Sequence, residues 1–277
     1  MNKACKGFCF WILLLLFPLH AGAYVPESSL LVELMLESMG NRGKMSMEVQ
    51  RSLPLAEGEA VPIEEKFLFN IPGVFRSETL DGKSFWLASA VDDFLLVHGA
   101  KRFTDSKPRL EDYFYAPMLL QDKEILLRFL QRRGVDITRS GLAKHGGKIC
   151  YRLGDARGSR LLLDKESFYP LFLILEERVS GITHRVEIQY RNWQGEKGSV
   201  FPGEVDILDG EGLLLQEIRI KKLAGNVFAD SLMNFEALKK RYPLSEGETR
   251  SPRLNPEPSD PLQGVEDSLD RFRRRYE

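Results

Sequence analysis

The feature that most constrains the fold is a long series of short segments in which apolar and polar residues alternate. In residues 182–190, for example, Ile182, Val186, Ile188 and Tyr190 are separated by polar neighbours. A period of two residues indicates β-strands, and breaks that recur about every ten residues favour antiparallel meanders over βαβ units. The strongest hairpin signal is the Asp-Gly pair at 81–82. The sequence therefore predicts an antiparallel sheet as its main element.

Some of these segments are apolar at consecutive positions, namely residues 94–97, 161–163, 171–175 and 213–215. Antiparallel strands usually bury one face and expose the other. Exposing a dozen large apolar side chains would cost on the order of 20 kcal/mol, which exceeds the usual net stability of a domain, about 5–15 kcal/mol. Both faces of these strands must therefore be covered, by helices, by a second layer, by a partner or by an apolar ligand.

Helical periodicity occurs in residues 30–39, which Ser28 or Ser29 can cap, and in residues 118–133. A short helix over residues 226–235 could close the domain. The two longer helices could cover the sheet. The apolar surplus then fits either an ordinary core or a cavity that is open to an acyl chain.

Residues 1–23 have the pattern of a secretory signal peptide. Two lysines precede an apolar run over residues 8–19, and Ala21 and Ala23 place small residues where signal peptidase reads them. At 1.5 Å per residue, such a run is too short for a hydrocarbon core of about 30 Å. We predict that the leader is cleaved after Ala23.

Charge and cysteine content exclude several classes of protein. Lys and Arg number 39 against 40 Asp and Glu, so the basic surplus of a nucleic-acid-binding protein is missing. Cleavage would remove Cys5 and Cys9 and leave Cys150 as the only thiol, so no intramolecular disulfide can form. Cys150 lies in a strand-like stretch, and we interpret it as a small buried apolar residue.

Catalytic and metal-binding motifs are absent from the sequence, which contains no GxSxG, Walker A, HExxH or GxGxxG. His98, His145 and His184 lie far apart, without Cys or carboxylates at the spacing of metal ligands. We interpret His184, on an apolar strand face, as a core residue. We expect no enzymatic activity, no cofactor and no metal.

The composition changes at the C-terminus. Residues 242–277 are polar and rich in proline, which predicts a flexible tail after a domain that spans residues 24–241. Within the tail, Val265, Leu269 and Phe272 recur at helical spacing, with acidic residues early and arginines late. This pattern predicts an amphipathic C-terminal helix, which could dock on a partner or an anionic membrane, or could be a marginal helix without function.

Four features of the chain together resemble those of a known protein family. They are the order of these elements, Pro-Gly-x-Phe-Arg at 72–76, Asp164-Lys165 before Pro170, and Asn226 before an aromatic segment at the end of the domain. Over residues 28–236 the chain resembles the outer-membrane lipoprotein-sorting (LolA/LolB-like) superfamily. This resemblance implies the α+β class and an incomplete, half-open antiparallel β-barrel whose helices cover the concave face. It also implies a periplasmic protein that holds acyl chains between sheet and helices without catalysis.

The sequence departs from this family at one functional position. The resemblance implies a basic residue directly before the proline of an early strand, where it latches the helical lid. Here that position is Ile71, and the nearest basic residue beyond it is Arg76. The receptor-type lipid anchor is also absent from the sequence.

We therefore predict a periplasmic carrier or chaperone that binds the acyl chains of lipids or lipoproteins for sorting to the outer membrane. The alternative is a sensor or assembly module that binds an envelope protein through its C-terminal helix. Transient membrane contact fits either function, and nucleic-acid binding fits neither. Strand parity suggests that the acyl chain contacts Phe67, Phe69, Phe75, Phe85, Leu87, Leu173 and Leu175.

Overall fold

The computed structural model describes residues 25–40, 43–54, 60–71, 73–89, 93–103, 110–179, 181–196, 199–225 and 228–244. The predicted signal peptide and the predicted C-terminal helix lie outside these ranges. The domain boundaries at residues 24 and 241 remain predictions.

The described strands form one 13-stranded antiparallel sheet, in the order β6-β5-β4-β3-β2-β1-β13-β12-β11-β10-β9-β8-β7. Its first half consists of β1 (Lys44–Pro54), β2 (Ala60–Asn70), β3 (Val74–Thr79), β4 (Ser84–Ser89), β5 (Phe94–His98) and β6 (Lys101–Phe103). Its second half consists of β7 (Ser140–His145), β8 (Lys148–Gly154), β9 (Arg160–Asp164), β10 (Pro170–Val179), β11 (Ile182–Glu196), β12 (Ser199–Asp209) and β13 (Leu214–Gly225).

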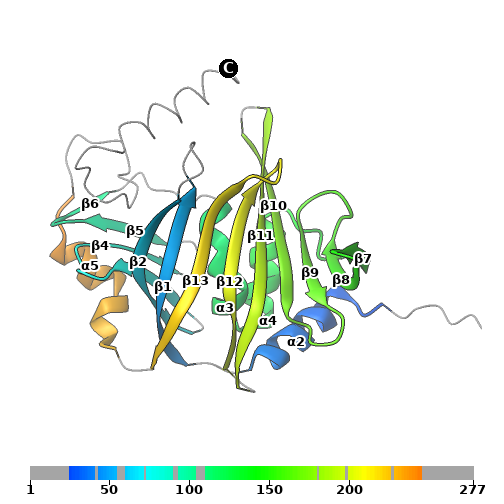
Figure 1. Cartoon of the computed structure of the whole chain (residues 1–277), viewed down its shortest axis with the longest axis horizontal. Coiled ribbons are helices and arrows are strands. Elements are labelled where there is room, and N and C mark those ends of the chain that lie inside the picture. The colour runs from blue at the N-terminus through cyan, green and yellow to red at the C-terminus, as the bar shows by residue number, and fades with distance from the viewer. Residues whose placement is uncertain are drawn as a thin grey trace, which may run out of the picture.

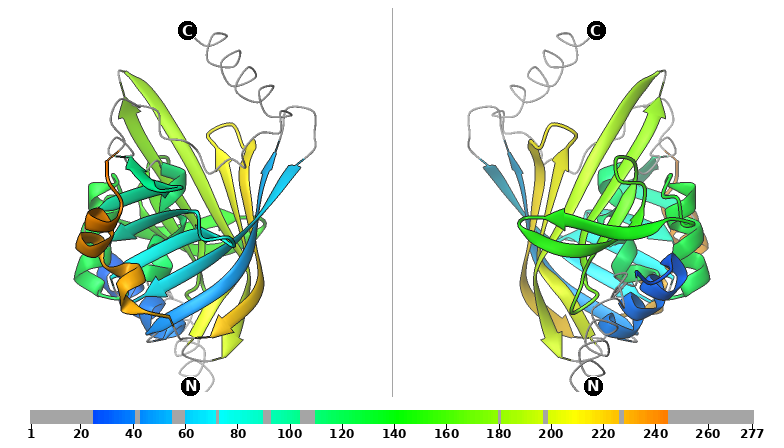
Figure 2. Two further views of the ribbon diagram at one scale, coloured as in Figure 1. Left: turned by 90° about the vertical axis from the view of Figure 1, so that its left-hand side faces the viewer. Right: turned by 90° about the vertical axis from the view of Figure 1, so that its right-hand side faces the viewer.

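Each half is a meander of neighbouring strands, and the pairing of β1 with β13 joins the two halves. This arrangement confirms the antiparallel sheet that the alternating segments predict. The twisted sheet curves into an open half-barrel and does not close on itself (Figures 1 and 2). The predicted α+β class and half-open barrel are therefore confirmed.

Helical elements cover the concave face of the half-barrel (Figure 1). They are α2 (Ser28–Met39), the 3₁₀ helix η1 (Leu110–Tyr115), α3 (Ala116–Leu119) and α4 (Lys123–Arg132). The expected single helix over residues 118–133 is broken, because Asp122 caps a new helix by accepting a hydrogen bond from the Ile125 amide at 2.9 Å. Neither expected serine caps α2, since the helix already begins at Ser28, whose hydroxyl donates to the Arg139 carbonyl oxygen.

A second helical layer covers the convex face of β3–β5. It consists of η2 (Asp230–Met233) and α5 (Phe235–Arg241), so the closing helix begins later than residues 226–235 suggest. Asn234 defines the start of α5 by accepting a hydrogen bond from the Ala237 amide at 2.9 Å. Because helices lie on both sides, strand β5 can bury residues 95–97 in alternate directions.

The other consecutive apolar runs differ in how they are covered. In β10, Leu173 and Leu175 face the main core, whereas Phe172 and Ile174 pack with Cys150 on the opposite face. Residues 213–215 at the β12–β13 turn stay exposed, with 56%, 40% and 37% of their surfaces accessible. Most of the apolar surplus is therefore core, and a small part lies on the surface.

The sequence predicts that Cys150 and His184 are both buried, and the structure agrees for only one of them. Cys150 is fully buried, as we expect for a small apolar residue. The interpretation of His184 as a core residue is wrong, because this side chain is exposed. It lies near the start of β11, where the strand extends beyond the helices that cover the rest of the sheet (Figure 1).

Candidate ligand-binding site

Aromatic side chains fill the space between the concave face and η1. Strands β2, β3 and β4 bring Phe67, Phe75 and Trp86 to the same face, and η1 places Phe114 and Tyr115 against them. The Phe75 ring lies 4.7 Å from Tyr115, 4.9 Å from Trp86 and 5.1 Å from Phe67, measured between ring centroids. These spacings are typical of favourable stacked and edge-to-face pairs.

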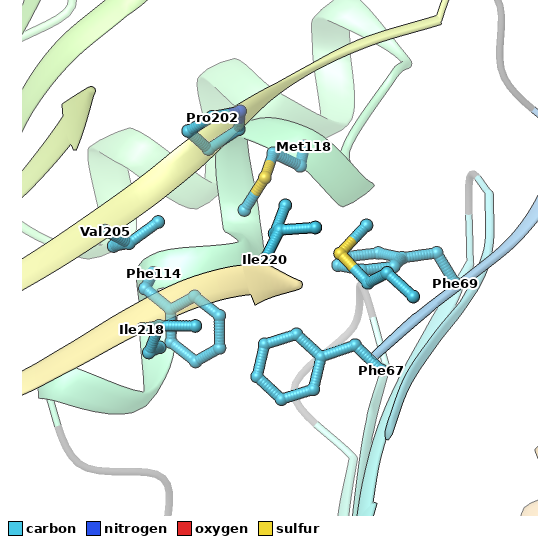
Figure 3. A pocket seen from close by; sticks show the side chains of 9 residues that line it. Phe67, Phe69, Phe114, Met118, Pro202, Val205, Ile218 and Ile220 are labelled. Carbon is cyan, nitrogen blue, oxygen red and sulfur yellow. The ribbon is translucent and has the colours of Figure 1, made fainter. Parts of the chain in front are cut away.

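A small cavity adjoins this aromatic cluster, between β1, β2, β12 and β13 on one side and η1 and α3 on the other (Figure 3). Its volume is about 10 Å³. It is lined by Met47, Phe67, Phe69, Phe114, Met118, Pro202, Val205, Ile218 and Ile220. Because a single water needs about this much space, no hydrocarbon chain fits into this cavity in the present conformation.

The structure separates the predicted contact residues into two groups. Phe67 and Phe69 line the cavity, and Phe75 packs against both of their rings. Leu173 and Leu175 belong to the same interior cluster but do not line the cavity.

Phe85 and Leu87 form the second group, on the opposite face of the sheet. They pack with Met233 and Leu238 under the outer helical layer. The reason is the register of the β3–β4 hairpin, which pairs Ser77 with Trp86 and thus turns Trp86 inward. The two residues therefore lie outside the interior that the other predicted residues share.

Several cavity residues are missing from the sequence-based prediction, namely Met47, Phe114, Met118, Pro202, Val205, Ile218 and Ile220. Ile218 and Ile220 lie in an alternating segment, so strand parity could have suggested them. No such signal exists for Phe114, which lies in an irregular aromatic stretch and reaches the cavity only through the position of η1.

Polar contacts anchor the helical layer at several points. The buried Tyr190 hydroxyl of β11 donates to the Phe114 carbonyl oxygen at 2.9 Å, and burial raises the pKa of Tyr190 well above its usual value. The Arg133 guanidinium donates to the Tyr113 hydroxyl. The Gln121 amide donates to the Gly40 carbonyl oxygen at 3.0 Å and thereby joins α2 to the start of α4.

Arg76 does not act as a latch for this layer, because it lies on the convex face. Its guanidinium donates to Glu78 at 2.7 Å and to the Leu232 carbonyl oxygen at 3.1 Å, and it stacks 3.6 Å from the centre of the Phe85 ring. Burial lowers the pKa of Arg76, an effect that Glu78 opposes. Arg76 therefore holds η2 against the outside of the sheet, while Ile71 packs into the interior.

The comparison with solved structures gives matches over most of the chain. A domain from Vibrio parahaemolyticus assigned to outer membrane lipoprotein sorting aligns with a TM-score of 0.52 and 14% identity, over 77% of this chain and 100% of its own. A LolA superfamily protein from Nitrosomonas europaea aligns with a TM-score of 0.52 and 11% identity, over 76% of this chain and 99% of its own. The chain has the LolA fold.

A DUF1329 family protein from Desulfovibrio piger also aligns with this chain, with a TM-score of 0.53 and 11% identity over 76% of this chain and 98% of its own. No family model and no curated protein matches the sequence. Among the described residues, no cluster of side chains could hold a metal ion. No helix in the same part of the chain is long and apolar enough to cross a bilayer.

Proposed function

We propose that this protein is a periplasmic carrier that binds the acyl chain of a lipid or lipoprotein between the concave face of its half-barrel and the helices η1 and α3. The observation that carries the proposal is the cavity between these two layers, whose lining side chains are apolar. Such a surface attracts hydrocarbon without directional contacts. The LolA fold, shared with a domain assigned to lipoprotein sorting, supports the same function.

Binding requires the helical layer to move, because a cavity of about 10 Å³ has no room for a hydrocarbon chain. The segment that must move is residues 110–119, which supplies Phe114 and Met118 to the cavity. Most of its side chains belong to the apolar cluster that also contains the inward-facing residues of the sheet. An acyl chain can replace the contacts of these side chains with the sheet at little cost in free energy. The free energy of burying apolar surface depends more on the buried area than on which apolar group covers it.

The direct test is native mass spectrometry of the protein purified from the periplasm of its source, followed by incubation with an acylated lipoprotein. We expect co-purified lipid, or uptake of the added lipoprotein in a one-to-one complex. An apo mass in the first measurement together with no uptake in the second would contradict the proposal.

A pair of variants on β13 tests whether binding uses the cavity. Ile220 lines the cavity and is partly buried, so Ile220→Gln places a polar group on the ligand path without removing core volume. Lys221→Gln, at the exposed neighbouring position, is the matched control. We expect Ile220→Gln to weaken acyl binding about tenfold, since a buried amide without partners costs about 1–3 kcal/mol, and Lys221→Gln to have no effect.

The alternative function, a sensor or assembly module for an envelope protein, remains a prediction from the sequence. The docking helix on which it depends lies outside the described residues. Removal of residues 245–277 separates the two functions, because it should abolish capture of a protein partner while leaving acyl binding intact.

A further inference from the structure

A polar cluster interrupts the apolar concave wall on β1, β2, β3 and β13. Arg51 donates to Glu65 at 2.9 Å and to the side chain of Gln216 at 3.2 Å, and the Ser77 hydroxyl donates to Glu65 at 2.7 Å. These residues share the face of Phe67 and Ile218, because each lies two positions along its own strand from an inward-facing residue.

The cluster is buried yet incompletely satisfied. The side chain of Glu65 is 0% exposed and that of Arg51 is 9% exposed. Arg51 Nε and Glu65 Oε1 are nonetheless buried without a hydrogen-bond partner among the described residues. A buried ion pair is often no more stable than apolar residues of similar volume, and each unsatisfied atom adds a further cost. A contribution to the stability of the fold therefore does not explain why this ion pair lies in the apolar wall.

The cluster also adjoins the candidate acyl site. The Arg51 guanidinium lies 5.8 Å from the centre of the Phe67 ring, and Phe67 lines the cavity. Three residues of β13 lie in order from the cavity to the strand end. Ile218 lines the cavity, Gln216 accepts a hydrogen bond from Arg51, and Leu214 is 40% exposed at the strand end. That end of the sheet extends beyond the described helices (Figure 1), so the polar cluster lies between the cavity and a rim that none of these helices covers.

We propose that the Arg51–Glu65 cluster binds the uncharged polar head of the acyl ligand, an inference that rests on the acyl-carrier function proposed above. Arg51 Nε offers a free donor and Glu65 Oε1 a free acceptor, so a head with one acceptor and one donor would satisfy both. The ester carbonyl and hydroxyl of a monoacylglycerol, or the carbonyl and N–H of an acyl amide, supply this pair. A carboxylate or phosphate is disfavoured, because Glu65 already balances the charge of Arg51.

The test is a competition between monoolein and oleate, which share one hydrocarbon chain and differ in the charge of the head. The full-length mature protein is incubated with equal concentrations of both ligands, and native mass spectrometry measures the ratio of the two complexes. We expect the monoolein complex to exceed the oleate complex at least about tenfold.

Glu65→Gln keeps the shape of the side chain but leaves the positive charge of Arg51 unbalanced. We expect the ratio to shift toward oleate by at least about tenfold, since a buried cation then meets an anionic head. The matched control is Glu64→Gln, at the exposed neighbouring position on β2, which should leave the ratio unchanged.

A second variant keeps the test conclusive if Glu65→Gln does not fold. Arg51→Met with Glu65→Leu replaces the pair by apolar groups, a change that buried ion pairs often tolerate. The wild-type protein should prefer monoolein over methyl oleate, which has the ester acceptor but no donor, and this double variant should lose that preference.

The outcomes separate the two proposals. If the wild-type protein binds both ligands without favouring monoolein, or if the Glu65→Gln and double variants keep the wild-type ratios, the head-group site is overturned and the acyl carrier stands. If the wild-type protein binds none of these ligands, the head-group site is overturned, and uptake of an acylated lipoprotein decides separately whether the acyl carrier stands.

Discussion

The hydroxyl of Tyr190 donates a hydrogen bond to the carbonyl oxygen of Phe114 across 2.9 Å of the buried interior. Tyr190 belongs to β11 and Phe114 to η1, so this bond connects the sheet to the helical segment that closes the candidate ligand site. The side chains of Phe114, Tyr115 and Met118 in this segment and the one after it pack into the main apolar cluster. The bond therefore couples the stability of the closed state to the accessibility of the cavity.

Tyr190→Phe removes this bond while keeping the ring. We expect the free energy of unfolding to fall by about 1–3 kcal/mol, because the buried Phe114 carbonyl loses its partner. We also expect acyl ligands to associate faster, since η1 detaches more readily. Urea denaturation measures the first effect and stopped-flow fluorescence the second. An unchanged association rate in a destabilised variant would show that η1 does not control access.

The stability of the protein should fall at alkaline pH. Burial raises the pKa of Tyr190 in the folded state, so the folded protein keeps a proton that the unfolded chain loses above about pH 10. The contribution is fully present below that pH and is lost as the pH rises beyond it, by at most about 1.4 kcal/mol per pH unit.

Urea midpoints of the wild-type protein and of Tyr190→Phe between pH 8 and pH 11 measure this effect. Tyr190→Phe has no titrating group at this position, so its midpoint should decline less steeply. Parallel declines in the two proteins would assign the alkaline loss of stability to other groups.

Cys150 should resist alkylation in the folded protein. It is fully buried, and burial raises the pKa of its thiol, with a further contribution from Asp164. We expect iodoacetamide at pH 8 to modify the thiol slowly in buffer and rapidly in urea, as intact-mass measurements of the mature protein would show. Equally fast modification in both conditions would mean that the β8–β10 region opens readily.

Arg76→Met should destabilise the protein without affecting the ligand site. It removes the hydrogen bond that holds η2, the hydrogen bond to Glu78 and the cation–π contact with Phe85, and we expect a loss of about 2–4 kcal/mol. Arg219→Met is the control, since it removes the ion pair of an exposed arginine, and such pairs contribute little to stability. Thermal unfolding measures both losses. Acyl binding that rises in Arg76→Met would instead indicate a latch.

The strand pattern predicted the local structure well, because alternation depends only on which face of a strand meets the solvent. The segment from Ile182 to Tyr190 illustrates both the strength and the limit of this signal. Its alternation correctly indicates a strand, but Ile182 and His184 are exposed while Val186 and Ile188 are buried. Which part of the strand is covered depends on the length of the helical layer, which residues on other elements determine.

The sequence predicts residues of the candidate site only where the alternation within a single strand is enough to place them. Phe67 and Phe69 follow from the parity of β2, whereas the placement of Phe85 and Leu87 depended on the register across a turn. A slip of one residue in register moves every side chain to the other face. Phe114 lies in a 3₁₀ segment without periodicity, so its role could not be derived from a pattern.

Short-range periodicity and composition are enough to specify the antiparallel strands, the main helices and more apolar surface than the chain can leave exposed. Long-range packing instead sets which faces the helices cover, leaves a cavity of about 10 Å³ between sheet and helices, and brings Arg51 and Glu65 together within the apolar wall. These outcomes depend on contacts between residues far apart in the chain, and no local pattern encodes the register and packing that bring such residues together.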